Sequence, residues 1–249
     1  MDLSKKLFSY FILFIPILLV TGPALPDILI TFSSIFLIIY IIYKKKTYLF
    51  LEYKWFKISI IFWLYLLIAS IFAYDITQSL INSFIFLRIL IIPLLLYLFI
   101  FNDSNLSKHL ITIIFFTLIF VIIDTFYQFL NYSTINGFGE DFFGYFPDNS
   151  PYNRLTGPFR DQIPGAFISK FSFIGLVFFY FFIKNISIRN LFIVTYLSIS
   201  GLVIFISGER MAFATFSLSL LLLFIFLDGF RKTIILSILI GTLFIFLAI

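Results

Sequence analysis

The amino-acid sequence predicts an all-α fold, a polytopic bundle of membrane-spanning helices. Of its 249 residues, 62% are hydrophobic and only 12% are charged, whereas charged residues make up about 25% of a typical soluble domain. The mean hydropathy is +1.13. Apolar runs of roughly 17 to 25 residues, the length that crosses a bilayer as a helix, recur along the chain. Each run is expected to be helical because an open strand would leave backbone groups unpaired in lipid.

Nine of these runs are expected to span the membrane. The first follows Lys5 and Lys6 and resembles a signal peptide. Residues 21–26 after it offer no convincing small-residue cleavage site, so we interpret the run as an uncleaved first span. The nine expected spans lie near residues 7–22, 27–43, 56–73, 80–101, 110–130, 165–183, 191–207, 211–227 and 233–249.

Basic residues on alternate connections predict the orientation of these spans. Because cytoplasmic loops carry the excess of Lys and Arg, the amino terminus is expected in the cytoplasm. The long polar stretch from Asn131 to Pro164, about 34 residues, is then one outer loop. Twelve of the 17 Lys and Arg residues follow the cytoplasmic pattern, at positions 5, 6, 44–46, 54, 57, 108, 184, 189, 231 and 232. The opposite side collects the acidic residues Asp27, Asp75, Glu140, Asp141, Asp148, Asp161 and Glu209.

Five basic residues lie outside this pattern and indicate an anionic ligand. They are Arg88, Arg154, Arg160, Lys170 and Arg210. Asp124 lies near the outer end of the fifth run, at a depth similar to that of Arg88 and Lys170. Ionisable groups at such depth are costly and usually face a bundle interior or a wet cavity. A structural ion pair remains the alternative for Arg88 and Asp124, and a side chain that reaches the membrane surface is the alternative for Lys170.

Helix direction adds a second argument for an anion site. The even-numbered runs begin at the expected outer face, so their amino-terminal amides and partial positive charge point there. Pro164 is placed to begin the sixth run, and Gly208-Glu209-Arg210 to begin the eighth. Arginine binds phosphate oxygens through paired N–H groups, and glycine lets backbone amides approach them. We therefore expect an anionic ligand next to lipid and reached from outside, and a polyprenyl pyrophosphate fits these conditions.

The composition argues against the common metal centres. The chain has no cysteine, which excludes disulfides and thiolate metal sites. The single histidine, His109, cannot build a zinc cluster. We expect no metal, no cofactor and no nucleic-acid partner.

Two segments resemble the O-antigen ligase and O-antigen polymerase family of integral membrane proteins. Residues 154–166 match that family's R-L-x-G-x-F-x-x-P-type loop, and residues 207–212 match its S-G-S-R-G-A-type turn, which opens a helix. The match covers residues 150–215 by motif and the whole chain by topology. Glu209 stands where the family often has serine, and Met211 where it often has glycine.

The resemblance implies glycosyl transfer at the outer face of a bacterial inner membrane. The family moves a glycan from undecaprenyl pyrophosphate to lipid A–core or to another glycan, without nucleotide sugar or ATP. Arg210 matches the arginine of the turn, which implies that it holds the pyrophosphate leaving group; anchoring of a helix end at the interface is its alternative. Arg154 and Arg160 are candidates for guiding the same phosphates. Gly157 and Phe159 of the loop, with Arg88 and Lys170, complete the expected binding residues, and Asp124, Asp161 and Glu209 have expected supporting roles.

Other interpretations stay open at this point. A lipid-linked oligosaccharide flippase would also need a cationic cavity, but it should show internal repeats and charges that lead to both faces. A role as a noncatalytic scaffold would account for the hydrophobicity but not for the Arg154 and Arg210 motifs. The family usually continues with a large outer loop that carries an arginine and a histidine, so we expect residues 1–249, read as one transmembrane domain, to be the amino-terminal part of a longer or split enzyme. We expect this chain to be inactive alone; if it is active, Asp161 is the first candidate for the base.

Overall fold

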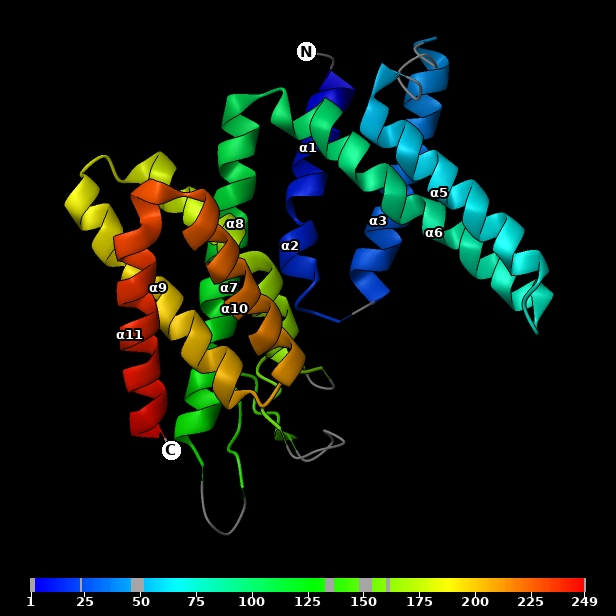
Figure 1. Ribbon diagram of the computed structural model, residues 1–249. Helices are drawn as coiled ribbons and strands as arrows, with labels where there is room; N and C mark the ends of the chain where they lie inside the picture. The colour runs from blue at the N-terminus through cyan, green and yellow to red at the C-terminus, as the bar shows by residue number, and fades with distance from the viewer. Residues whose placement is uncertain are drawn as a thin grey trace. The chain divides into compact units, whose positions relative to one another are not determined.

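The computed structural model describes residues 3–22, 24–45, 52–132, 137–147, 154–159 and 162–248. Within these ranges every named regular element is a helix (Figure 1). The chain groups into two compact units. Unit 1 consists of Met1–Ile15 and Pro23–Ser107, and unit 2 consists of Pro16–Gly22 and Lys108–Ile249.

Seven helices in the described part of the chain are long and apolar enough to cross a membrane. They are α3 (Ala24–Tyr43), α5 (Lys54–Ile71), α6 with η1 (Ile76–Phe101), α7 (Ser104–Leu130), α8 (Pro164–Phe182), α9 (Ile186–Ile206), and η3 with α11 (Asp228–Leu247). The prediction of an all-α chain with several membrane-length helices is confirmed. The remaining two of the nine expected spans correspond to shorter apolar helices, Phe8–Leu18 and α10 (Arg210–Phe226). The count of nine therefore stays a prediction.

The first expected span is divided at a proline. Helix α1 covers Leu3–Leu13 and α2 covers Ile15–Leu18, with Pro16 in the second piece. Proline has no backbone N–H and its ring clashes with the preceding turn, so a continuous helix is not favoured there. The hydropathy of the run gave no sign of this interruption.

Unit 1 contains α1, α3, α5, α6 (Ile76–Leu96) and the π-helical turn η1 (Tyr97–Phe101). Asp75 caps the amino terminus of α6, because its side chain accepts a hydrogen bond from the Gln78 amide at 2.9 Å. Small polar side chains join α5 to α6: the Ser70 and Ser83 hydroxyls lie 2.6 Å apart. Trp63 of α5 also donates to the Ser83 carbonyl at 2.9 Å. Such hydrogen bonds hold membrane helices together where burial of apolar surface supplies no driving force.

Unit 2 is a helical bundle in which α9 packs against α8, α10 and α11. Its core is mostly aliphatic and aromatic, and Phe115 of α7 stacks on Phe178 of α8 with ring centroids 4.1 Å apart. Gly175 lies directly against the Tyr196 ring, and the Tyr196 hydroxyl donates to the Ser172 carbonyl at 2.9 Å. The small residues of α8 thus allow close approach of α9.

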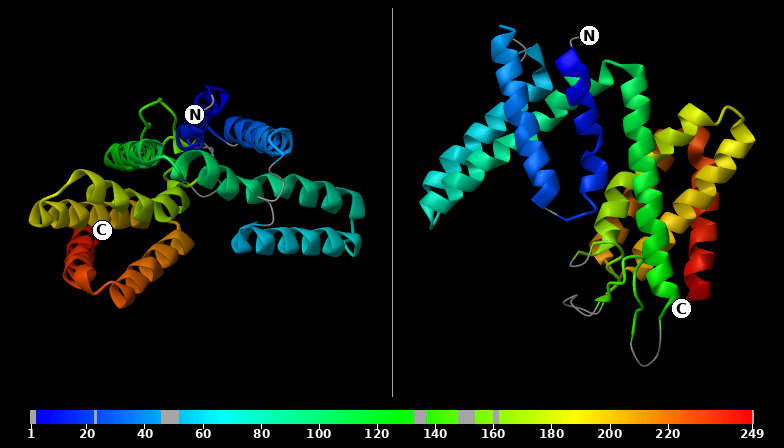
Figure 2. Two further views of the ribbon diagram at one scale, coloured as in Figure 1. Left: turned by 90° about the horizontal axis from the view of Figure 1, so that it is seen from above. Right: turned by 180° about the vertical axis from the view of Figure 1, so that it is seen from behind.

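The helix directions in unit 2 place the polar loop and the two motifs at one end. Helices α7 and α9 end, and α8 and α10 begin, at the end where residues 137–147 and 154–159 lie (Figure 1). The connections α8–α9 and α10–α11 lie at the opposite end (Figure 2). The first contains Lys184, and the second contains Asp228, which forms an ion pair with Arg231 at the start of α11 (Arg231–Ala248). Within this unit, the loop residues Glu140 and Asp141 therefore lie at the end opposite to Lys184, Arg231 and Lys232.

Candidate functional site

The candidate site in unit 2 consists of three segments. They are residues 154–159, which we name the Arg154 loop; the first turn of α8; and residues 207–210, which we name the α9–α10 turn. Helix α8 begins at Pro164 and α10 begins at Arg210, as the sequence predicted. Proline is favoured in the first helical turn because its missing N–H has no intrahelical partner to lose.

Gln128 fixes the Arg154 loop to the end of α7. Its side-chain oxygen accepts hydrogen bonds from the amides of Thr156 and Gly157, both at 2.9 Å. Its amide nitrogen donates to the Thr156 hydroxyl at 3.3 Å. Gln128 is fully buried, so these bonds replace the water that the amide and the loop backbone would otherwise need.

Gly157 and Phe159 shape this loop rather than line an open surface. Gly157 has φ of +49°, and a Cβ at this position would collide with the Thr125 hydroxyl of α7. Only glycine meets both conditions without strain. Phe159 is buried and its ring lies 5.2 Å from that of Phe167 in α8. The two residues therefore hold the loop against α7 and α8.

Arg154 lies beside the α9–α10 turn. A Cβ placed on Gly208 would lie 3.6 Å from both Cδ and Nε of Arg154. Gly208 itself has φ of +73°, the left-handed conformation that ends α9. The Arg154 loop and the α9–α10 turn, more than 40 residues apart in sequence, thus meet in space.

Glu209 ties this turn to the first turn of α8. Its carboxylate oxygen Oε2 accepts a hydrogen bond from the Ala166 amide at 2.6 Å. A carboxylate is stabilised at this position by the partial positive charge of the helix amino terminus. Gly165 permits the approach, since a Cβ there would lie 2.6 Å from the Ser207 hydroxyl and 3.0 Å from Glu209 Oε2. We expected the amino terminus of α8 to face an external anion. A carboxylate of the same chain, that of Glu209, accepts a hydrogen bond there instead.

Arg210 and Lys170 are exposed cations among the described residues of this region. Arg210 is the first residue of α10, and Lys170 lies in the second turn of α8. The amides of the first turn of a helix have no intrahelical acceptor. Together with the guanidinium of Arg210, the start of α10 is suited to bind an anion.

Asp124 is buried at the same end of unit 2. It is fully inaccessible, and its Oδ1 accepts a hydrogen bond from the Phe142 amide at 2.7 Å. Asp124 therefore supports the loop backbone rather than an arginine. Arg160 and Asp161 lie outside the described residues.

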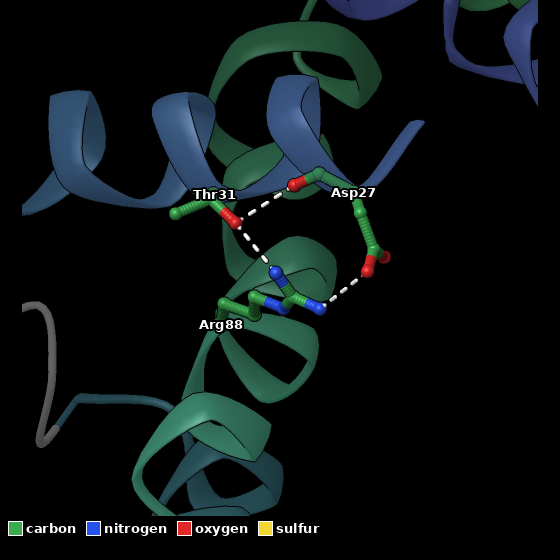
Figure 3. Close-up of polar contacts among 3 residues, drawn as sticks. All are labelled: Asp27, Thr31 and Arg88. Carbon is green, nitrogen blue, oxygen red and sulfur yellow. Dashed lines mark hydrogen bonds and ion pairs between the residues drawn. The ribbon is translucent and has the colours of Figure 1, made fainter. Parts of the chain in front are cut away.

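Arg88 belongs to unit 1, where its partners come from α3. Its guanidinium forms an ion pair with Asp27 at 2.7 Å and donates to the Thr31 hydroxyl at 2.8 Å (Figure 3). The sequence left open a structural ion pair between Arg88 and Asp124. Arg88 does form an ion pair, but its partner is Asp27 rather than Asp124.

Three residues of this arrangement were missed by sequence reasoning: Gln128, Thr125 and Asp141. The spacing of Asp124, Thr125 and Gln128 was a usable signal, because residues i and i+4 share one face of a helix. Polar residues on one face of an apolar run indicate contact with something polar, here the loop. Asp141 gave no such signal, since acidic residues are common in outer loops.

Comparison with protein-family models, curated proteins and solved structures gives no match for this chain. Within the described residues, no three Asp, Glu or His side chains gather as a possible metal centre.

Proposed function

We propose that this chain takes part in transfer of a glycan from a polyprenyl pyrophosphate to lipid A–core or to another glycan. The reaction would occur at the outer face of a bacterial inner membrane. The observation that carries the proposal is the proximity of Arg154 to Gly208. This contact joins the two segments whose order and spacing resemble the O-antigen ligase and polymerase family.

The chemistry of this region suits a pyrophosphate leaving group. When the bond between sugar and phosphate breaks, negative charge develops on the phosphate, and fixed cations stabilise it. Arg210 is exposed at the start of α10, where the helix amides add partial positive charge. Arg154, which already has an interaction partner in this structure, lies beside the same turn and adds positive charge there.

Glu209 refines where the phosphates would bind. Its carboxylate occupies the first turn of α8 through the Ala166 amide, and two anions are not expected to share one helix terminus. We therefore assign the pyrophosphate to the start of α10 and the Arg154 side, rather than to α8. The serine that often stands at this position in the family would leave the α8 amides open.

The proposal includes a nine-span topology with a cytoplasmic amino terminus and residues 131–164 outside. It is supported by the charge alternation in the sequence and by the position of Glu140 and Asp141 at the end of unit 2 opposite to Lys184, Arg231 and Lys232. In this orientation the starts of α8 and α10 face outward. The polyprenyl chain of the donor would lie in the bilayer beside them.

The test replaces Arg210 in the native gene of the source organism. Arg210→Ala is expected to abolish the transferred glycan, and Arg210→Lys to restore only part of it, because lysine lacks the paired N–H geometry. Lys184→Ala, an exposed cation at the opposite end of unit 2, is the matched control and should transfer normally. Membrane abundance of each variant is measured by immunoblot, and the comparison uses variants of equal abundance.

The same strains separate transfer from transport. With Arg210→Ala, the lipid-linked donor should accumulate where an external glycosidase can reach it. Accumulation on the cytoplasmic side only would support the flippase alternative. Normal transfer by Arg210→Ala would overturn the proposed role of Arg210.

A further inference from the structure

Two buried carboxylates lie at the loop end of unit 2 and have no role in the proposed phosphate site. Asp124 on α7 is 0% exposed, and Asp141 in the loop is 3% exposed. Carboxylates are almost never buried to this extent unless they are paired. Asp124 and Asp141 therefore need a group that neutralises their charge.

In each carboxylate, only one of the two oxygens accepts a hydrogen bond. Asp124 Oδ1 accepts from the Phe142 amide at 2.7 Å, and Asp141 Oδ1 accepts from the Phe143 and Tyr145 amides, both at 2.8 Å. Backbone amides favour the ionised form of a carboxylate. The second oxygen, Oδ2, is buried in both residues and has no hydrogen-bond partner. Two negative groups thus each retain an oxygen with unused acceptor capacity.

The two carboxylates are neighbours. They bind the adjacent amides of Phe142 and Phe143 in one turn, residues 141–145, which we name the acidic turn. Two carboxylates held by adjacent amides of one turn repel each other when both are ionised. Neither forms an ion pair with a Lys or Arg of the described ranges. Two like charges buried side by side require a compensating positive charge.

A metal cation meets this requirement better than a shared proton. A single shared proton would neutralise one of the two charges, whereas a divalent cation neutralises both. Neither Oδ2 accepts a hydrogen bond from the described residues. A calcium ion binds oxygen at about 2.3–2.6 Å, so it can join two oxygens that are about 4–5 Å apart. Calcium is favoured over magnesium because both oxygens are buried, and magnesium usually keeps several bound waters.

We propose that Asp124 and Asp141 bind one calcium ion through their Oδ2 atoms at the end of α7. Carbonyl oxygens of the loop and water molecules would complete the coordination of the ion. This proposal differs from the sequence expectation of no metal, which rested on the absence of cysteine and the single histidine. It does not depend on glycan transfer.

The ion would stabilise the segment that holds the Arg154 loop. Asp124 and Gln128 are one turn apart on α7, and the Gln128 side chain donates to the Tyr145 carbonyl at 3.5 Å as well as to Thr156. Tyr145 closes the acidic turn through a hydrogen bond from the Asp141 amide to its carbonyl at 3.0 Å. Neutralising the two carboxylates therefore supports the turn, Gln128 and the Arg154 loop together.

Terbium luminescence tests the site directly in the purified, detergent-solubilised chain. Tb³⁺ replaces Ca²⁺ at oxygen sites and is excited through nearby tyrosines; Tyr145 lies in the acidic turn. After treatment with EDTA, we expect a tyrosine-sensitised Tb³⁺ signal that Ca²⁺ displaces more effectively than Mg²⁺. Asp124→Asn and Asp141→Asn should each weaken binding by at least about tenfold. Glu140→Gln, an exposed neighbour, is the matched control and should bind like the native chain.

A second measurement does not depend on the variants. Thermal unfolding of the native chain is compared in EDTA and in excess Ca²⁺, and Ca²⁺ should raise the midpoint, because a ligand that binds only the folded state stabilises it. An unchanged midpoint would overturn the proposal. A Tb³⁺ signal that persists in Asp124→Asn, or one lost equally in Glu140→Gln, would also overturn it.

Discussion

Loss of the Glu209 carboxylate should loosen the junction between α8 and α10. Glu209 accepts a 2.6 Å hydrogen bond from the Ala166 amide in the first turn of α8. A hydrogen bond to a charged group contributes about 1.5–3 kcal/mol, and the carboxylate also interacts with the helix dipole. Because Glu209 is half-buried, we expect Glu209→Ala to lower the free energy of unfolding by about 2 kcal/mol, within that range.

The assay is thermal unfolding of the purified chain in detergent, followed by circular dichroism. For a chain of this length, about 1 kcal/mol corresponds to roughly 2–4 °C, so Glu209→Ala should lower the midpoint by about 4–8 °C. Glu209→Gln keeps an acceptor without the charge and should lose about half as much. Glu140→Ala, an exposed carboxylate in the loop, should change little. Equal midpoints for Glu209→Ala and Glu140→Ala would refute the reasoning.

Two further predictions concern packing and topology. Gly165→Ala places a methyl group 2.6 Å from the Ser207 hydroxyl and should lower the free energy of unfolding by about 1–3 kcal/mol. Adding Ser207→Ala to Gly165→Ala should recover part of this loss. Equal unfolding midpoints for the single and the double variant would contradict the contact. Because the chain has no cysteine, Glu140→Cys and Lys184→Cys can be labelled singly with an impermeant maleimide. Glu140→Cys should react in intact cells and Lys184→Cys only after lysis, and the reverse pattern would exclude the proposed orientation.

Local signals in the sequence predicted the helix starts at the candidate site. Pro164 and the Gly208-Glu209-Arg210 segment act on their own neighbourhood, so α8 and α10 begin where expected. The start of α7 was less visible. This helix begins at Ser104, before the apolar run expected from residue 110, because Asp103 accepts from the Asn105 amide at 2.9 Å and supports a polar first turn.

Contacts between distant residues were harder to predict. The pairing of Arg88 with Asp27 depends on the packing of α3 against α6, and an apolar run carries little information about its neighbours. Likewise, Gln128 binds amides 28 and 29 positions away. The proximity of the two motifs followed from topology, but the use of Glu209 as a ligand for α8 required the three-dimensional structure.

The central claim is that the Arg154 loop and the α9–α10 turn form one site for a polyprenyl pyrophosphate. A photoreactive polyprenyl-pyrophosphate glycan tests it most directly. The probe carries its reactive group next to the phosphates and is cross-linked to native membranes, and the labelled peptides are identified by mass spectrometry. We predict labels within residues 154–159 and 207–213, with competition by unlabelled donor. Labels confined to the α8–α9 or α10–α11 connections, or no competed label on this chain, would contradict the claim.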